Sequence, residues 1–443
     1  MSLRFALSLF AIAAGVYVNS ALHTSNPVCI VGAGPGGLTI AHELEAKGIS
    51  TVTFEKQPAV GGKCQSYYDG SNESVYHPMG ALIYTNQTWA NTLPIIQASG
   101  LPLSEGSPTQ FLTHGFYYGA GKAANVVTPS PPTPADFQAS LVQEAQKYTQ
   151  YWETSFAPKY LDPRFKNGVP VELAEKITPY GYGDITQTPA LYMLTYITPD
   201  ILSAFLGATP TYNVDFHRVM VFYSKSIQGP IHVNAAVTKI DRSRKTPAVT
   251  YTKGNAKNTQ KCRDVVLAFP PTLDNLHAVD MPLSRGETEV FSKTVVTPYW
   301  SSAVTTKIDF PAIYLQTPLV PSGAPVAFQR TSSLSHVATA WSWAAFGNHF
   351  SLDDIKHLLA ITLTSVQKGA AIASPTVTPA DVKEVMKIDY FPRFNSTELE
   401  HGFYKKYNAL QGQQHTYYSS ALNNFELVEY AIQAGKELVA TFF

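Results

Sequence analysis

Three glycines near the N-terminus have the spacing of a phosphate-binding turn. In the stretch VCIVGAGPGG, Gly32, Gly34 and Gly37 form the pattern G-x-G-x-x-G. Glycine at these positions permits a tight turn, a close approach of the backbone to a pyrophosphate, and close packing of a helix on a strand. The free N–H groups at the start of the next helix favour an anion. The pattern therefore predicts a dinucleotide-binding site.

The surrounding residues predict the βαβ unit that such a turn requires. Residues 27–31 form a short apolar, β-branched run that is typical of a buried strand. Residues 35–47 have apolar side chains at helical spacing, and Gly48 stands where a C-cap glycine is expected. Residues 50–55 alternate as a second strand that ends at Glu55. An acid at this distance binds a ribose hydroxyl and argues against a 2′-phosphate, which it would repel.

Composition and charge exclude some classes of function. The 443 residues are 45% hydrophobic, which is enough for two globular cores, and the formal net charge is zero. With only 14% charged residues, the chain gives no sign of a basic surface for nucleic acid or for an acidic membrane. We therefore expect a small-molecule substrate and no nucleic-acid partner.

The first 21 residues have the pattern of a secretory signal peptide. Arg4 is followed by an apolar run and then by small residues. The run is too short to span a bilayer comfortably, since about 20 apolar residues are needed; an uncleaved anchor is the alternative. We expect a secreted or lumenal protein with no stable membrane insertion after cleavage. Glycosylation sequons without a central proline occur at Asn72, Asn86 and Asn395.

The three cysteines do not indicate a disulfide framework. Cys29 falls in the first predicted strand and is expected to be a small buried residue. Cys64 and Cys262 are the candidate pair, and Cys64 is expected to be structural. The fold must therefore depend on its hydrophobic core.

Further segments resemble known proteins. Gly61 and Gly62, in KQPAVGGKCQS, resemble the second glycine motif of flavin amine oxidases, usually R-x-G-G-R, and Lys63 keeps one of its cations. The segment PIHVNAAVTKIDRS is similar to the strand whose backbone contacts the adenine, with Val237 at the matching position. The segment DVVLAFPPTL resembles the A-x-P-P-T-L strand end near the cofactor. The chain is thus similar to the flavin amine oxidase superfamily.

The C-terminal segment YYSSALNNFELVEYAIQAGKELV is similar to the last flavin-binding strand and helix of that superfamily, with a helix expected over about 424–442. We expect the acidic residue that usually precedes this helix to be missing, with Ser419, Ser420 and Asn423 in its place. Backbone N–H groups near Asn424 are expected to face the flavin and to stabilise its reduced anion.

The resemblance implies an α/β fold, with a glutathione-reductase-like FAD-binding Rossmann domain and an α+β substrate domain. The FAD-binding domain is expected to comprise residues 25–100, 215–275 and 390–443, and the substrate domain residues 101–214 and 276–389. FAD is the implied cofactor. The residues expected to bind it are Gly32, Gly34, Gly36, Gly37, Glu55, Lys56, Gly61, Gly62, Lys63, Val237, Ser420 and Asn424.

Within the superfamily, GGKCQSYYD and YHPMGALIY most resemble a fungal group named for β-cyclopiazonate dehydrogenase. The resemblance implies an oxidase that takes a hydride from a hydrophobic amine or an indole-alkaloid-like substrate, with ring closure in secondary metabolism, and that reduces O2 to H2O2. It makes His77 the candidate proton acceptor or flavin attachment point. Lys307 matches the lysine that holds a water near the flavin. A packing histidine and an exposed lysine are the alternatives.

Aromatic residues indicate where a substrate binds. Trp341 and Trp343 alternate along a predicted strand and so share one face. With Tyr390 and Phe391 they are expected to line a cavity for a flat substrate, and an ordinary core is the alternative. No metal site is expected. Two other functions stay open: an FAD-dependent desaturase or isomerase acting on C–C bonds, and a non-catalytic binding protein that keeps the fold.

Overall fold

The computed structural model describes residues 26–70, 75–106, 114–118, 124–129, 135–160, 188–314 and 321–443. The predicted signal segment, residues 1–21, and the sequon at Asn72 lie outside these ranges. Among the residues described, no helix is both long and apolar enough to cross a membrane.

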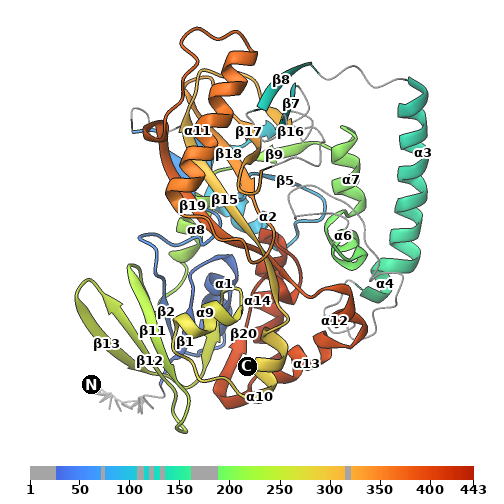
Figure 1. Ribbon diagram of the computed structural model, residues 1–443. Helices are drawn as coiled ribbons and strands as arrows, with labels where there is room; N and C mark the ends of the chain where they lie inside the picture. The colour runs from blue at the N-terminus through green and yellow to red at the C-terminus, as the bar shows by residue number, and fades with distance from the viewer. Residues whose placement is uncertain are drawn as a thin grey trace, which may run out of the picture.

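A five-stranded parallel sheet organises the half of the molecule that contains both ends of the described chain (Figure 1). Its order is β10-β2-β1-β14-β20, and every neighbouring pair is parallel. The strands are β1 (Val28–Val31), β2 (Thr51–Phe54), β10 (Ile231–His232), β14 (Val265–Leu267) and β20 (Thr416–Tyr418). With α1 (Pro35–Ala46) between β1 and β2, the predicted βαβ unit is confirmed.

Helices and a small sheet surround this parallel sheet. The last helix, α14 (Val428–Phe442), packs closely on α1. A Cβ atom on Gly435 would lie only 3.0 Å from the carbonyl oxygen of Gly36, so the absence of a side chain at Gly435 permits this approach. An antiparallel sheet projects beside β2, with β11 (Ala235–Asp241), β12 (Ala248–Lys253) and β13 (Ala256–Lys261). The other helices here are α8 (Phe216–Ser224), α9 (Leu273–Ala278), α10 (Arg285–Phe291), α12 (Ser396–Glu400) and α13 (Phe403–Leu410).

A seven-stranded sheet forms the other half, in the order β19-β15-β18-β17-β16-β7-β8. Its strands are β7 (His114–Tyr118), β8 (Ala124–Pro129), β15 (Val295–Thr305), β16 (Ala312–Tyr314), β17 (Pro325–Gln329), β18 (Val337–Trp343) and β19 (Val382–Arg393). Only β16 and β7 pair in parallel among these described strands. The helix α11 (Leu352–Gly369) lies along one face of this sheet (Figure 1), and its buried apolar side chains pack on that face.

Smaller elements complete this half. The hairpin of β3 (Ser66–Tyr68) and β4 (Tyr76–Pro78) lies on β18, where Thr339 Oγ1 donates a hydrogen bond of 3.1 Å to the Pro78 carbonyl. A three-stranded sheet contains β5 (Ile83–Thr85), β6 (Ser104–Gly106) and β9 (Thr211–Asn213). Among the described residues, the further α-helices are α2 (Leu93–Ser99), α3 (Ala135–Tyr151), α4 (Ala157–Tyr160), α6 (Ala190–Tyr196) and α7 (Pro199–Phe205), with a π-helical turn (Trp152–Phe156) between α3 and α4.

The disulfide differs from the expected one. Cys29, in β1, is bonded to Cys262, and both are fully buried. The strand β14 lies beside β1 with Cys29 opposite Val265, which brings the chain just before β14 to Cys29. Cys64 is a buried free thiol. The predicted pairing of Cys64 with Cys262 is therefore wrong.

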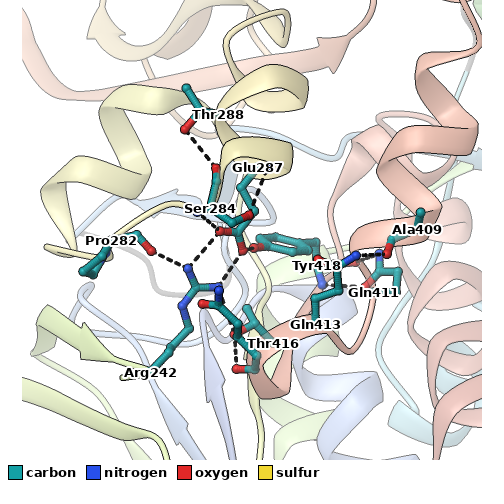
Figure 2. A network of polar contacts seen from close by, with 11 residues as sticks. Arg242, Pro282, Ser284, Glu287, Thr288, Ala409, Gln411, Gln413, Thr416 and Tyr418 are labelled. Atoms are coloured by element: carbon teal, nitrogen blue, oxygen red, sulfur yellow. Dashed lines mark hydrogen bonds and ion pairs between the residues drawn. The ribbon is translucent and has the colours of Figure 1, made fainter. Parts of the chain in front are cut away.

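A buried ion pair anchors β20 (Figure 2). Arg242 contacts both carboxylate oxygens of Glu287, at 2.6 and 2.9 Å, and both side chains are at most 3% exposed. The Tyr418 hydroxyl donates to the same carboxylate, and Arg242 also donates to Thr416 Oγ1 at 3.2 Å. Because Thr416 and Tyr418 belong to β20, the network fixes the strand that leads directly to Ser419.

Candidate active site

Two glycines of the turn after β1 are required by packing. Gly32 has φ +109°, and a Cβ atom there would lie 2.7 Å from the carbonyl oxygen of Ala268. A Cβ atom on Gly37 would lie 2.0 Å from the carbonyl oxygen of Gly32. No larger residue fits at either position without moving the backbone. The turn can therefore follow β1 and enter α1 only with glycine at both sites.

A second glycine turn lies against the first. Gly62 has φ +54°, and a Cβ atom on it would lie 2.8 Å from the Cα atom of Gly34. The N–H of Gly61 donates a 2.8 Å hydrogen bond to the carbonyl of Ala33. Gly34 is the N-cap of α1 and provides no side-chain cap. The two turns thus form a side-chain-free cradle at the start of a helix, which suits the pyrophosphate of a dinucleotide.

Glu55 is bound to the first turn. It is 5% exposed, and its Oε2 accepts a 2.8 Å hydrogen bond from the N–H of Ala33. Its Oε1 accepts another of 2.8 Å from the N–H of Gln57. Each carboxylate oxygen has a further lone pair. Glu55 is therefore oriented by the backbone and still able to accept a hydrogen bond from a ribose hydroxyl.

One cavity of about 1480 Å3 joins this cradle to the seven-stranded sheet. Its volume exceeds the 300–1,000 Å3 of ordinary small-ligand sites, so it has room for a dinucleotide and a second molecule. Of the residues that the sequence predicts for the site, these line it: Gly32, Gly34, Gly36, Glu55, Lys56, Gly62, Lys63, Val237, Ser420, Trp341 and Tyr390. Gly37 and Gly61 shape the turns without lining the cavity.

The C-terminal wall of the cavity differs from expectation. The helix α14 begins at Val428, later than predicted, and its N-cap is Leu427. Asn424 lies outside the cavity lining, and its N–H donates to the carbonyl of Ala421 at 3.2 Å. The N–H of Asn424 is therefore bonded within the chain, and Asn424 itself does not line the cavity, whereas its neighbours Phe425 and Glu426 do. Ser419 and Ser420 do line the cavity.

Glu426 is a residue of the site that the sequence argument missed. It directly precedes the N-cap of α14 and lines the cavity, so the expectation that no acid precedes the last helix is also wrong. Its Oε2 lies 2.7 Å from the Lys63 ammonium. The late helix start was the missing information: placing the helix at residue 424 puts Glu426 inside it.

Two of the four aromatic residues predicted for the substrate cavity lie in the cavity lining. Trp341 and Tyr390 line the cavity, and Tyr390 stacks on Tyr299, another lining residue, with ring centroids 4.8 Å apart. Trp343 lies outside the lining although it shares a strand with Trp341. Phe391 is 1% exposed and packs edge-on against Tyr192 in the core. Tyr390, which precedes it on β19, faces the cavity because successive side chains of a strand point to opposite faces of the sheet.

Neither predicted catalytic residue lines the cavity. His77 pairs with Tyr67 in the β3–β4 hairpin and is fully buried. Neither of its ring nitrogens has a hydrogen-bond partner in the described part of the chain, and burial lowers its pKa, so it is neutral. Lys307 lies beyond the end of β15, is exposed, and donates to the carbonyl of Ala373 at 3.0 Å. The structure thus places His77 in the packed interior and Lys307 at the surface, both outside the cavity lining.

Two other groups complete the chemistry of the site. Burial raises the pKa of the Cys64 thiol to about 12, with a further contribution from Glu426, so this lining cysteine stays protonated and unreactive. Within the described ranges, no cluster of three or more metal-ligating side chains occurs. The arrangement can bind a dinucleotide, orient an apolar molecule beside it, and exclude water.

Comparison with known proteins supports this description. The NAD(P)-binding Rossmann-like domain family matches residues 30–93. The FAD-dependent oxidoreductase dpchF of Colletotrichum higginsianum is 25% identical, over 89% of this chain and 88% of that protein. The β-cyclopiazonate dehydrogenase of Aspergillus flavus is a more distant relative, 23% identical over 66% of this chain and 65% of that protein.

Solved structures share the architecture. A fatty acid isomerase from P. acnes that produces CLA superposes with a TM-score of 0.74 at 18% identity, covering 94% of this chain and 99% of that one. Putrescine oxidase with bound putrescine gives a TM-score of 0.58 at 14% identity, covering 94% and 98%. The chain therefore has the α/β fold, built on a Rossmann-like parallel sheet, that this isomerase and this amine oxidase share.

Proposed function

We propose that the protein is an FAD-dependent oxidoreductase that takes a hydride from a hydrophobic amine or an indole-alkaloid-like substrate. The observation that carries the proposal is the single cavity that joins the glycine cradle to the aromatic side chains of Trp341, Tyr299 and Tyr390. Three of the relatives with similar sequences are described as FAD-dependent oxidoreductases. FAD has a free 2′-hydroxyl on its adenosine ribose, and the Glu55 carboxylate at the end of β2 favours such a hydroxyl.

The residues of the cradle fit FAD. Gly34, Gly36 and Gly62 leave room for the pyrophosphate at the start of α1, and Glu55 presents a carboxylate to the adenosine ribose. Lys56 and Val237 line the same end, and Ser420 lines the opposite end. FAD bound there would supply the hydride acceptor, and in an oxidase the reduced flavin would give two electrons, together with two protons, to O2 to form H2O2.

The protein's own contribution is orientation and exclusion of water. The stacked Tyr299 and Tyr390, with Trp341 on the neighbouring strand, present flat apolar surfaces to a substrate. Rigid aromatic walls hold the reacting C–H bond in one orientation, which lowers the entropic cost of reaction. An electrophile formed there is shielded from water, so an internal carbon nucleophile can close a ring in secondary metabolism.

The test is reduction of the bound flavin without oxygen. Candidate amines and indole alkaloids are mixed with the purified protein anaerobically, and the flavin absorbance is followed. We expect a substrate of this class to bleach the flavin, and air to restore it with one H2O2 per turnover. The non-catalytic binding protein would be favoured if chemical reductants bleach the flavin but no amine or indole alkaloid does.

A desaturase or isomerase acting on C–C bonds is the second candidate, and one observation favours it. The part of the cavity beside α7 is lined by Tyr84, Thr85, Trp89, Tyr196, Ile201, Ala204 and Phe205. None of these side chains is charged, so this part suits an elongated apolar chain. Oxygen consumption separates an isomerase from an oxidase, because an oxidase consumes O2 for each product and an isomerase consumes none. A desaturase is distinguished by its product, which has two hydrogens fewer and one more C–C double bond.

We further propose that the protein is secreted or resides in the secretory lumen. The fully buried Cys29–Cys262 disulfide supports this location, because disulfides persist in oxidising compartments. The sequon residues Asn86 and Asn395 are both exposed. Expression of the full chain in eukaryotic cells should yield medium or lumenal protein whose mass falls on treatment with a glycosidase; an intracellular, unglycosylated product would contradict the location.

A further inference from the structure

Lys63 is among the residues expected to bind FAD, but its ammonium is held by partners outside the glycine cradle. Lys63 Nζ lies 2.7 Å from Glu426 Oε2 and donates a 2.8 Å hydrogen bond to the carbonyl of Asp389. It also lies 5.7 Å from the centroid of the Tyr390 ring. These partners belong to the C-terminal and aromatic walls of the cavity, not to the glycine cradle.

Glu426 is held in place independently of Lys63. Its Oε2 also accepts a 2.8 Å hydrogen bond from the N–H of Phe391, and its side chain is only 12% exposed. Phe391 has a left-handed backbone, φ +51°, near the end of β19, an edge strand of the seven-stranded sheet. The carboxylate therefore has a fixed backbone donor, and it orients the more exposed lysine, whose side chain is 30% exposed.

The strand order tells which end of the cofactor this pair faces. A dinucleotide lies across the carboxyl ends of the parallel strands. Glu55 follows β2 on one side of β1, whereas Ser419 and Glu426 follow β20 on the other side. Because Glu55 receives the adenosine ribose under the proposed function, the β20 side receives the flavin. The Lys63–Glu426 pair lines the cavity on that side.

We propose that Lys63 is a charge-tuning residue of the flavin end and that Glu426 is its positioning residue. This inference rests on the proposed function, since it concerns bound FAD. As a pair the two charges nearly cancel. Reduced flavin carries a negative charge at neutral pH, so an unpaired cation nearby stabilises the reduced form and an unpaired carboxylate destabilises it. The balance between these two charges therefore decides whether this wall of the cavity stabilises or destabilises the reduced flavin.

The experiment measures two quantities on Lys63→Gln, Glu426→Gln, the double variant and Lys63→Arg: the dissociation constant of FAD for the apoprotein, and the midpoint potential of the bound flavin. Lys63→Gln leaves Glu426 unpaired and should lower the potential; Glu426→Gln leaves Lys63 unpaired and should raise it. The double variant and Lys63→Arg should both return toward the wild-type value. FAD affinity should change by no more than about threefold.

A matched control and a second reading keep the test decisive. Lys239 lies on β11, is half exposed and pairs with Asp280, outside the cavity lining, so Lys239→Gln removes the same charge and should move neither quantity. A merely structural role would lower the melting temperature of the variants without opposite potential shifts. If Glu426→Gln does not fold, the inference is still tested by Lys63→Gln, which should lower the potential, and by Lys63→Arg, which should restore it. Both substitutions are at the more exposed residue of the pair.

Two results would overturn the inference. If Lys63 binds a phosphate, Lys63→Gln should weaken FAD binding about tenfold or more at an unchanged potential, and the double variant should not recover. Potentials that move in the same direction in both single variants would also contradict it. Failure of the wild-type protein to bind FAD is a different outcome, because it would reject the proposed function itself.

Discussion

Glu55 and Ala33 join the two strands that create the cofactor cradle: the carboxylate at the end of β2 accepts a 2.8 Å hydrogen bond from the N–H in the turn after β1. The second carboxylate oxygen is bound at 2.8 Å to the N–H of Gln57. One side chain thus fixes the turn and presents its remaining lone pairs to the cavity that it lines.

Replacing this carboxylate should weaken cofactor binding. In Glu55→Gln one acceptor oxygen is replaced by an amide donor and the negative charge is lost, so the hydrogen bond to the ribose hydroxyl is weakened by about 1–3 kcal/mol and FAD affinity should fall about tenfold. The measurement is a fluorescence titration of the apoprotein with FAD. Glu289→Gln, at an exposed carboxylate paired with Lys406, is the control. Equal affinities for both variants and the wild type would remove Glu55 from the site.

The disulfide should be essential to stability. Converting Cys29 and Cys262 together to alanine should lower the free energy of unfolding by about 2–5 kcal/mol, measured by urea denaturation, because the bond closes a long loop. Peptide mapping without reduction should find Cys29 linked to Cys262. Cys64 should react with iodoacetamide only after unfolding, since burial raises its pKa to about 12. A Cys64–Cys262 peptide would contradict the structure.

The Arg242–Glu287 pair predicts an acid-sensitive stability. Burial alone would raise the pKa of Glu287, but hydrogen bonds from Arg242, Tyr418 and the N–H of Ser284 hold it below its ordinary value of 4.5. A depressed carboxylate pKa stabilises the fold above that value, and the contribution is lost as pH falls through the native pKa.

Glu287→Gln should therefore lose about 3–5 kcal/mol at pH 7, because it leaves Arg242 buried without a counter-ion. Its stability should also decline less steeply than that of the wild type on acidification below about pH 5. Urea denaturation at several pH values measures both effects. An unchanged acid slope would show that other carboxylates dominate the acid sensitivity.

Two tryptophans on one strand provide a matched pair for the substrate site. Trp341 lines the cavity and Trp343 does not. Trp341→Ala should lower kcat/KM for the best substrate by about tenfold or more, through lost orientation and packing, while Trp343→Ala should change it little. Steady-state kinetics with saturating FAD measures the contrast. Equal losses would mean that the aromatic wall acts only on stability.

The cofactor half of the molecule was largely predictable from the sequence. The turn, α1 and both flanking strands follow from glycine spacing and hydrophobic periodicity, which are local signals, and their predicted bounds agree with the structure. Gly32 and Gly37 have little freedom because a neighbouring backbone oxygen lies where a Cβ atom would be.

The errors arise where a residue's role depends on distant chain segments. The partner of Cys29 follows from β14 lying beside β1, which local patterns do not reveal. Lys307 resembles a strand residue, but β15 ends at Thr305 and the lysine turns to the carbonyl of Ala373. Glu426 was hidden by a helix start placed four residues early. Strand pairing and helix termini are set by tertiary packing, so a single sequence predicts them poorly.

The most direct test of the central claim is the visible absorption spectrum of the purified, mature protein. We predict the two absorption bands of an oxidised flavin, either as isolated or after FAD is added to the apoprotein and the excess removed. The bands should disappear on anaerobic reduction and return in air. A folded protein that stays colourless after incubation with FAD would contradict the claim that the glycine cradle holds this cofactor.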